Sequence, residues 1–242
     1  MRKVFDKDVP SSLSELLEPR RTALLIIDMQ NYGCAPKGIN HESGADLSMY
    51  EQIVPRIARF AEVCRGLGIL VINVKMSTLP NGLSNSPAWM RMRMRSNHIY
   101  DTSDARVWNS QVEGTWSAEF VEALAPKPGD LVVQKFRSSA MHGTNLDLIL
   151  RSNDIRTALV AGSTTEGCVE STVRDLGFYD YFAVVLSDCV GSDVRVLHEA
   201  SMLVMSAYRA EVTTAAEVEG IWNRMATPSA VGAAPVSSAS SA

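Results

Sequence analysis

Five short apolar runs constrain the fold of this chain more than any other feature. Each is nearly continuous in Val, Ile, Leu and Ala, and they are residues 23–27, 69–74, 131–133, 158–161 and 182–186. Strands that are covered on both faces have this composition, whereas half-exposed strands alternate apolar and polar residues. The runs therefore predict an α/β fold built on a parallel sheet.

Segments with helical periodicity lie between these runs, so strand and helix alternate along the chain. We expect helices at residues 53–67, 144–150, 168–176 and 194–208, and a short sixth strand at 210–213. With 242 residues, 46% of them hydrophobic, the chain is long enough for one large core. We predict a single domain at 21–225, preceded by an extension at 1–20. Residues 226–242 form a low-complexity tail, predicted to be frayed unless a neighbouring subunit holds it.

Residues 76–116 interrupt this alternation. The segment is rich in Ser, Asn, Arg and Met and has no clear period. Long irregular stretches of compact domains tend to be lids or subunit-contact loops, although a plain surface insertion fits as well. Within it, Arg91, Arg93 and Arg95 alternate with methionines, which we interpret as a solvated or subunit-facing stretch.

Charge and cysteine usage exclude several classes of protein. The 23 basic and 27 acidic residues give a net charge of −4 without a long basic stripe, which argues against nucleic-acid binding. No run approaches the ~20 apolar residues of a membrane span, and the first residues lack the apolar core of a signal peptide. The cysteines show no C-x-x-C spacing, which argues against a zinc ribbon, a redox pair or a disulfide framework. We expect a cytoplasmic protein with neither a nucleic-acid nor a membrane partner.

Reactive side chains follow three of the apolar runs. Asp28 ends the first run, Lys135 follows the third, and Cys168 follows the fourth after a Gly-Ser-Thr-Thr-Glu-Gly turn. Because parallel strands gather their carboxyl ends at one edge of a sheet, these groups can meet there. Each residue alone also has an ordinary structural interpretation, Asp28 as a turn residue and Lys135 as a solvated strand exit.

Cys168 is the candidate nucleophile. It lies where a strand runs into a predicted helix, and free N–H groups at a helix start favour a thiolate and can receive an oxyanion. The sequence therefore predicts a lowered pKa for the Cys168 thiol, with Asp28 as the group that takes its proton. The alternative is that Cys168 is a small buried hydrophobic residue, as most free cysteines are.

The three motifs resemble those of the isochorismatase-like cysteine hydrolases, over approximately residues 21–225. They are Leu-Ile-Ile-Asp-Met-Gln-Asn at 25–31, Val-Gln-Lys-Phe-Arg-Ser at 133–138, and Gly-Ser-Thr-Thr-Glu-Gly-Cys-Val-Glu-Ser-Thr at 162–172. The resemblance implies a three-layer α/β/α, Rossmann-like doubly wound fold with a six-stranded parallel sheet. It also implies an Asp28–Lys135–Cys168 catalytic triad.

Further properties follow from the same resemblance. It implies a cis peptide bond between Ser163 and Thr164, and an oxyanion hole formed by the N–H groups of Thr164 and Cys168. Nicotinamidases of the family carry metal-binding histidines after the second strand, but residues 73–78 contain none, so we expect no metal and no cofactor. His41, His98, His142 and His198 are dispersed, and we assign them no catalytic role.

The presence of the full triad favours hydrolysis of a C–N bond over vinyl-ether cleavage. Residues 114–116, 128–130, 148–152 and 168–175 look like those of ureidoacrylate amidohydrolases. We expect a cysteine-dependent amidohydrolase that cleaves a small linear amide, ureido or carbamoyl substrate through a thioester, with a ureidoacrylate-like substrate favoured. Biuret-, N-carbamoylsarcosine- and maleamate-type amidases and an isochorismatase-type hydrolase are the alternatives. Family likeness also implies a homo-oligomer, a dimer or tetramer.

Four side chains near the ends of the motifs are candidate substrate contacts. They are Asn31, Tyr32, Trp116 and Arg137, of which Arg137 can pair bidentately with a substrate carboxylate.

A redox sensor is the competing non-enzymatic function. It would use Cys168 with Cys34 or Cys189 as the resolving thiol, and Cys189 is expected near the same sheet edge.

Overall fold

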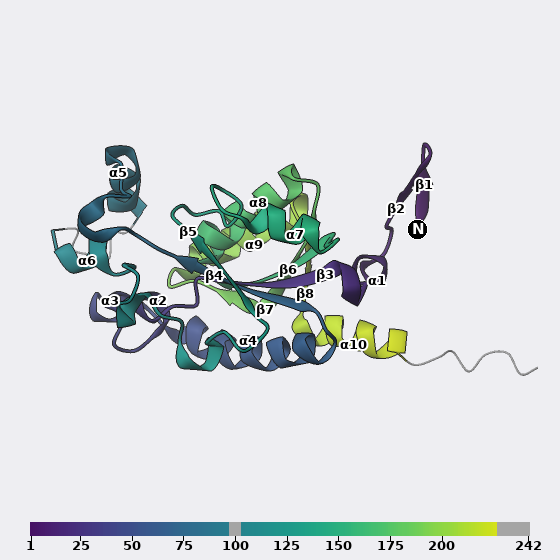
Figure 1. Ribbon diagram of the computed structural model, residues 1–242, viewed down its shortest axis with the longest axis horizontal. Coiled ribbons are helices and arrows are strands. Elements are labelled where there is room, and N and C mark those ends of the chain that lie inside the picture. The colour runs from purple at the N-terminus through teal and green to yellow at the C-terminus, as the bar shows by residue number, and fades with distance from the viewer. Residues whose placement is uncertain (97–102, 227–242) are drawn as a thin grey trace, which may run out of the picture.

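A six-stranded parallel sheet in the order β5-β4-β3-β6-β7-β8 forms the centre of the protein (Figure 1). The structure is a computed structural model that describes residues 1–96 and 103–226. The sheet strands are β3 (Thr22–Ile27), β4 (Leu70–Met76), β5 (Leu131–Lys135), β6 (Thr157–Ser163), β7 (Phe182–Gly191) and β8 (Glu211–Thr213). Each of the five apolar runs and the expected sixth strand coincides with one of these strands, although β4 and β8 begin one residue later than predicted, and the predicted sheet is confirmed.

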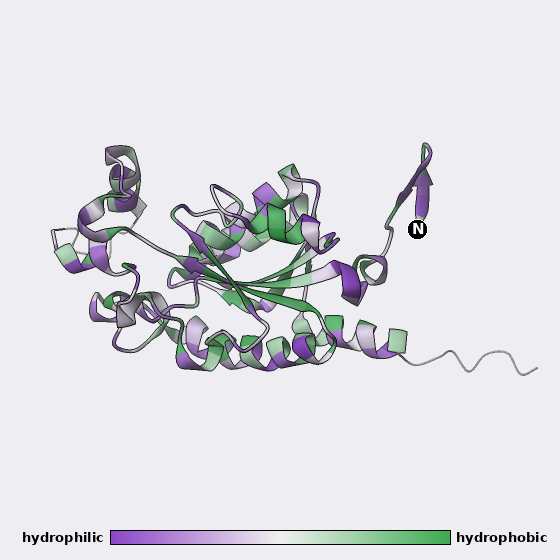
Figure 2. Cartoon of the chain, in the orientation of Figure 1, coloured by the Kyte–Doolittle hydropathy of each residue, from purple (hydrophilic) through white to green (hydrophobic). Residues whose placement is uncertain are grey.

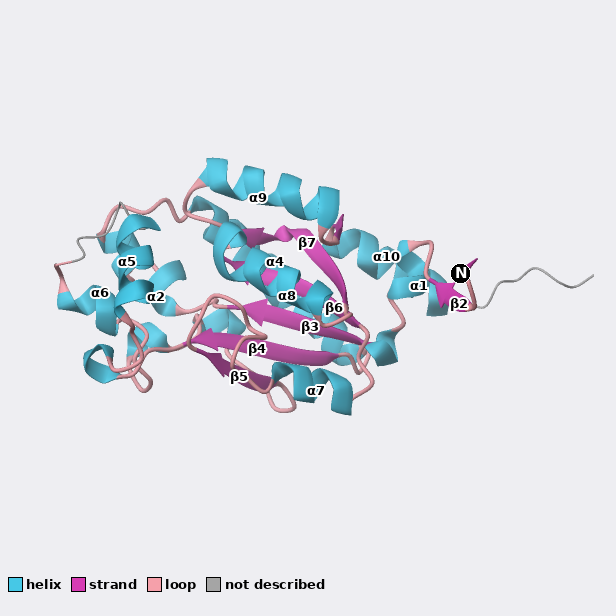
Figure 3. Cartoon of the chain, turned by 90° about the horizontal axis from the view of Figure 1, so that it is seen from above, coloured by secondary structure: helices cyan, strands magenta, loops and turns pink. Residues whose placement is uncertain are grey.

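Helices cover both faces of the sheet (Figure 3). One face carries α4 (Ser48–Gly66) and α10 (Ala215–Ala226), and the other carries α7 (Leu146–Ser152), α8 (Glu170–Phe178) and α9 (Arg195–Tyr208). Leu24 and Ile26 of β3 face the α4 side, while Leu25 and Ile27 face the α8 side. Because both faces of the strand are buried, its sequence is apolar throughout, as the colouring in Figure 2 shows for the centre of the sheet.

The strand order creates a topological switch point between β3 and β6, in the middle of the sheet. The chain runs from β3 outward through β4 to β5, returns to β6 beside β3, and then continues outward through β7 to β8. The carboxyl ends of β3 and β6 therefore diverge into connections on opposite sides, and such a switch point leaves a crevice for ligands. Asp28 follows β3 there, and Cys168 follows β6.

The segment 76–116 contains helices that its sequence did not reveal. Besides short turns it holds α5 (Pro87–Ser96) and α6 (Ala105–Asn109), which lie beyond the carboxyl ends of the strands (Figure 1). The alternation of Met and Arg has a period of two and conceals a helical stripe of Trp89, Met92 and Arg93. Two further short helices, α2 (Asn31–Cys34) and α3 (Ile39–Glu42), lie at the same end of the molecule.

The two ends of the chain differ in how they join the domain. The antiparallel hairpin β1 (Arg2–Val4) and β2 (Lys7–Val9) projects from the body, whereas Leu17, just after α1 (Leu13–Leu16), is fully buried. The Trp222 indole N–H donates a 2.8 Å hydrogen bond to the Leu17 carbonyl. Part of the predicted extension thus packs on the domain, and the predicted tail lies outside the described residues except for Ala226. No helix in the described ranges is long and apolar enough to cross a membrane.

Candidate active site

The three predicted triad residues meet at the carboxyl edge of the sheet. Lys135 Nζ lies 2.7 Å from Asp28 Oδ2 and 3.1 Å from Cys168 Sγ. Asp28 follows β3 with φ 52°, in the left-handed region that few non-glycine residues adopt, and such residues cluster at active sites. The structure therefore brings together an acid, an amine and a thiol from three separate strand ends.

Lys135 reaches this cluster across a neighbouring strand. It is the last residue of β5, paired in register with Met76 of β4, while Asp28 follows β3 on the far side. Strands lie about 4.8 Å apart, so only a long side chain spans β4. On the way Nζ lies 3.3 Å from Met76 Sδ, and it also donates to the Arg137 carbonyl at 3.2 Å. These contacts hold the Lys135 ammonium group in place, and the side chain is completely buried.

The charges of the cluster keep Lys135 protonated. Desolvation lowers the pKa of Lys135, but the negative charges of Asp28 and Cys168 oppose it and the pKa is raised overall. Asp28 is only 2% exposed, and neither of its carboxylate oxygens receives a well-aligned hydrogen bond from the described residues. The carboxylate therefore keeps lone pairs that can accept a proton.

The pKa of the Cys168 thiol differs from the sequence-based expectation. Desolvation by burial and the negative charge of Asp28 raise the pKa of Cys168 to about 12, although Lys135 acts to lower it. The predicted low-pKa thiol is therefore wrong, because the sequence argument considered the helix start and the lysine but not the desolvation. In the unliganded protein the sulfur is protonated, and a base must take its proton as it attacks.

The backbone that carries Cys168 also differs from expectation. Cys168 lies in the π-helical turn η5 (Thr165–Val169), and the α-helix α8 begins after it. The Ser163–Thr164 peptide bond is cis, as the family resemblance implies. The N–H groups of Gly167 and Val169 donate to the Thr164 carbonyl at 3.1 and 3.2 Å.

Gly162 allows β6 to enter this turn. Its φ is 117°, and a Cβ at this position would lie 2.1 Å from the Ile27 carbonyl oxygen of β3. Only glycine permits this close approach of the two strands that carry Asp28 and Cys168.

A polar network behind the turn fixes η5 to α9. Thr165 Oγ1 and His198 Nδ1 are 2.8 Å apart, and the Ser201 hydroxyl donates to the Thr165 carbonyl at 3.2 Å and to Glu170 at 2.5 Å. His198 therefore contacts the turn from behind and not from the cavity. Of the other histidines, His98 lies outside the described residues.

A cavity of about 370 Å³ opens above the partly exposed Cys168. Its lining includes Tyr32 from α2, Trp89, Met92 and Arg93 from α5, Thr164 and Glu166 from the turn, and Asp193 after β7. Asp28 and Lys135 lie beneath the sulfur and do not line the cavity. The arrangement places a thiol at the floor of a pocket large enough for a small organic molecule, with an acid and an amine behind it.

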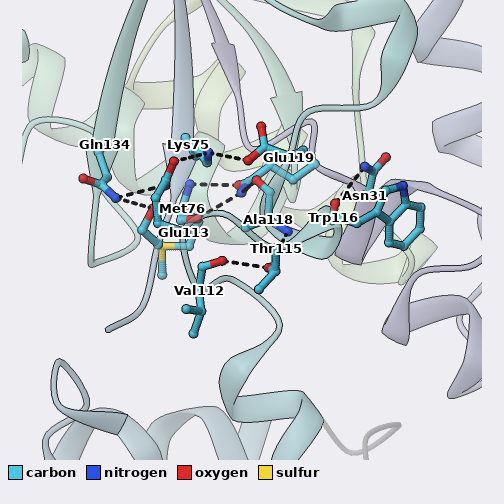
Figure 4. Close-up of polar contacts among 12 residues, drawn as sticks. Asn31, Lys75, Met76, Val112, Glu113, Thr115, Trp116, Ala118, Glu119 and Gln134 are labelled. Atoms are coloured by element: carbon cyan, nitrogen blue, oxygen red, sulfur yellow. Dashed lines mark hydrogen bonds and ion pairs between the residues drawn. The ribbon is translucent and has the colours of Figure 1, made fainter. Parts of the chain in front are cut away.

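Of the four candidate substrate contacts, Tyr32 lines this cavity and the other three do not. The Asn31 side-chain amide donates to the Trp116 carbonyl at 2.9 Å, and the Trp116 side chain is 53% exposed (Figure 4). The Arg137 guanidinium lies 5.0 Å from the centre of the Trp89 ring and donates to the Ser84 carbonyl at 3.2 Å. Substrate contact stays a prediction for Tyr32, while these polar groups of Asn31 and Arg137 bind other parts of the chain.

A second network attaches the segment around residue 115 to β4 (Figure 4). Lys75 Nζ pairs with Glu113 at 3.0 Å and Glu119 at 3.4 Å, and the Gln134 amide donates to the Ser77 hydroxyl at 2.9 Å. This network holds the connection between α6 and β5 against the carboxyl ends of the strands.

Gln30 is the buried centre of that attachment. Its amide nitrogen donates to the carbonyls of Met76 at 3.0 Å and Ala118 at 2.7 Å, and its oxygen accepts from the Met76 N–H at 2.9 Å. Gln30 is fully buried. We expect Gln30→Ala to lower the free energy of unfolding by about 3 kcal/mol, because three buried backbone groups lose their partner and a cavity forms. Urea titration measures this change.

The exposed Gln52 on α4 provides the matched control for this prediction. Gln52→Ala should change the free energy of unfolding by less than about 0.5 kcal/mol. Equal stabilities of the two variants would contradict the role given to Gln30.

Sequence reasoning missed the cavity residues of α5 and, in the turn, Glu166. The sequence around Arg93 indicates a solvated or subunit-facing stretch, and no pattern singles out Glu166, although both residues line the cavity. The spacing of Trp89, Met92 and Arg93 was the available signal for α5. The described residues contain no group of three or more His, Cys, Asp or Glu side chains arranged to hold a metal ion.

The structure also places the two candidate resolving cysteines. Cys189 is fully buried in the cluster on the α4 side of the sheet, whereas Cys168 packs against the cluster on the other side. Cys189 lies near the carboxyl end of β7, as expected, but it packs on the opposite face of the sheet from Cys168. Cys34 lies nearer, with its sulfur 3.9 Å from the Ser163 hydroxyl, and burial raises its pKa to about 12. Neither the position of Cys189 nor the raised pKa of Cys34 favours the sensor function.

The chain is similar to known proteins over most of its length. The Isochorismatase domain family matches residues 22–217. Ureidoacrylate amidohydrolase RutB of Methylobacterium radiotolerans is 33% identical over 211 residues, covering 84% of this chain and 80% of that protein. The same-named protein of Caulobacter segnis is 30% identical over 217 residues, covering 87% and 89%. A cysteine hydrolase from Pseudomonas syringae pv. phaseolicola is 28% identical with a TM-score of 0.73, covering 86% of this chain and 95% of that one.

Proposed function

We propose that this chain, which belongs to the isochorismatase family and is an amidohydrolase of that family, cleaves its substrate through a thioester on Cys168. The substrate is a small linear amide, ureido or carbamoyl compound. The contact of Lys135 Nζ with both Asp28 and Cys168, directly beneath the cavity, is the observation that carries the proposal.

Asp28 acts first as a general base. As the Cys168 sulfur forms a bond to the substrate carbonyl carbon, the thiol proton passes to Asp28, whose carboxylate has lone pairs available. The raised pKa of Cys168 supports this order, because the thiol keeps its proton until a substrate is bound. Lys135 remains protonated and balances the negative charge as it moves from carboxylate to sulfur.

Asp28 then acts as an acid and again as a base. The carbonyl oxygen becomes an oxyanion, which the N–H groups of Thr164 and Cys168 stabilise; the Thr164 N–H donates to no other described residue. Collapse of this intermediate breaks the C–N bond, and the proton on Asp28 leaves with the ammonia or amine. Water attacks the thioester while Asp28 takes its proton, and the acid product departs as that proton returns to sulfur.

A ureidoacrylate-like compound is the favoured substrate. The relatives named ureidoacrylate amidohydrolase are 30% and 33% identical to this chain and match it over more than four fifths of its length. The cavity also contains one basic and two acidic side chains, Arg93, Glu166 and Asp193, which suit a substrate with an anionic end and N–H donors.

An ammonia-release screen tests the proposal. The wild-type protein is offered ureidoacrylate, biuret, N-carbamoylsarcosine, maleamate and nicotinamide, and acid-quenched samples are analysed by mass spectrometry. We expect ammonia from ureidoacrylate and an acyl adduct on the peptide that contains Cys168. Ammonia release without any adduct on Cys168 under single-turnover conditions would count against the thioester, and no hydrolysis of any amide would count against the function.

A further inference from the structure

One face of helix α5 forms a wall of the cavity. Trp89, Met92 and Arg93 line it, and their spacing places them on a single side of the helix. Arg91 and Arg95 of the same helix are exposed, whereas Arg93 is partly buried. The helix thus turns one of its three arginines toward Cys168 and the others toward solvent.

Arg137 fixes α5 to the sheet. It follows Lys135 by two residues, and its guanidinium stacks on Trp89 of α5 at 5.0 Å while donating to the Ser84 carbonyl at 3.2 Å. The guanidinium also donates to the Phe136 carbonyl at 2.5 Å. Arg137 comes just after β5, so these contacts position α5, and with it Arg93, relative to the sheet edge where Cys168 lies. Arg137, which the sequence suggested as a substrate contact, instead positions the helix that carries Arg93.

Arg93 is the only basic side chain among the described residues that line the cavity. Its positive charge acts on Tyr32 across the cavity wall and opposes the rise in the pKa of that phenol, which burial causes. Arg93 also interacts with neighbouring groups of the protein. A guanidinium in a partly desolvated cavity is suited to bidentate pairing with a carboxylate.

Two acids share the cavity with Arg93. Glu166 accepts a 2.9 Å hydrogen bond from the Ser192 hydroxyl, and burial, together with Asp193, raises the pKa of Glu166. The carboxylates of Glu166 and Asp193 attract N–H donors of a substrate and repel its anionic groups. Among the described residues that line the cavity, a substrate carboxylate therefore has one cationic partner, and the ureido N–H groups have two anionic partners.

We infer that Arg93 is a specificity-determining residue that binds the carboxylate of the substrate, so that the enzyme selects small amides bearing an anionic group. The inference rests on the proposed amidohydrolase function and deepens it. It also assigns different roles to two arginines: Arg93 contacts the substrate, and Arg137 holds α5 in place.

The test compares Arg93→Met with Arg91→Met on ureidoacrylate and on its methyl ester. Arg91 is the matched control, because it lies on the same helix with the same charge but is exposed. We expect Arg93→Met to raise KM for the acid by about 30-fold, the loss of one charge-assisted interaction, and to change KM for the ester by less than about threefold. Arg91→Met should change neither KM by more than about twofold.

Two kinetic results overturn the assignment. Equal losses for acid and ester in Arg93→Met would mean that Arg93 serves only to support α5, and identical behaviour of the two variants would mean that Arg93 contacts no substrate. Calorimetric binding of ureidoacrylate to the Cys168→Ala protein separates this inference from the function. Binding that survives Arg93→Met in that background refutes the inference even if the wild type is an active amidase. If ureidoacrylate binding depends on Arg93 but the wild-type protein hydrolyses no amide, the inference is supported and the proposed function is refuted.

Discussion

Replacement of Cys168 by alanine is expected to lower kcat for amide hydrolysis by 10⁴-fold or more, on the order of the losses seen when covalent nucleophiles are removed. The cavity, Asp28 and Lys135 remain, so substrate binding should change little. The Cys168 side chain is small and only partly buried, and its removal leaves the Asp28–Lys135 ion pair intact. Ammonia release at saturating ureidoacrylate measures the loss, and circular dichroism shows that the fold is retained.

Cys64 provides the matched control for this experiment. It is fully buried in α4, far along the chain from the site and on the opposite face of the sheet. Cys64→Ala should keep kcat within about twofold of wild type, although it loses some stability through a small cavity. Retention of wild-type activity in Cys168→Ala would instead favour an isochorismatase-type hydrolase in which Asp28 alone carries the chemistry.

The fold and the triad could be predicted because each leaves a local trace in the sequence. A strand buried on both faces must be apolar throughout, so β3 and β6 are visible as runs. A group that reacts at the carboxyl edge lies soon after such a run: Asp28 follows its run directly, and Cys168 follows its run after the turn at 162–167. Lys135 comes shortly after its run and ends β5, although its reach across β4 depends on the strand order, which no single run specifies.

The remaining features depend on three-dimensional surroundings that no local pattern encodes. Arg93 and Glu166 line the cavity because α5 and η5 converge around it, and the polar groups of Asn31 and Arg137 bind backbone carbonyls of distant segments. The sign of the Cys168 pKa shift is also a tertiary property. It depends on how much water the fold removes and on the distance to Asp28, and neither quantity appears in the sequence.

Exchange of Asp28 for asparagine is expected to move catalysis and thiol reactivity in opposite directions. Without the base and acid, kcat for amide hydrolysis should fall by about 10²- to 10⁴-fold. The Asp28 charge raises the pKa of Cys168, so its removal should lower that pKa while Lys135 remains to stabilise the thiolate. At any pH below the wild-type value of about 12, the variant then holds more thiolate, and iodoacetamide should alkylate Cys168 faster.

The pH dependence of alkylation gives this prediction its sharpest form. Because the wild-type pKa is about 12, its alkylation rate should rise about tenfold for each pH unit from 7 to 10, whereas the rate in Asp28→Asn should level off at lower pH. Peptide mapping assigns the modified cysteine, and Asp6→Asn on the exposed N-terminal hairpin should match wild type in both assays. If Asp28→Asn instead slowed alkylation, Asp28 would be helping to ionise the sulfur in the resting enzyme. The proton would then leave before substrate binds, and Asp28 would enter the reaction as an acid.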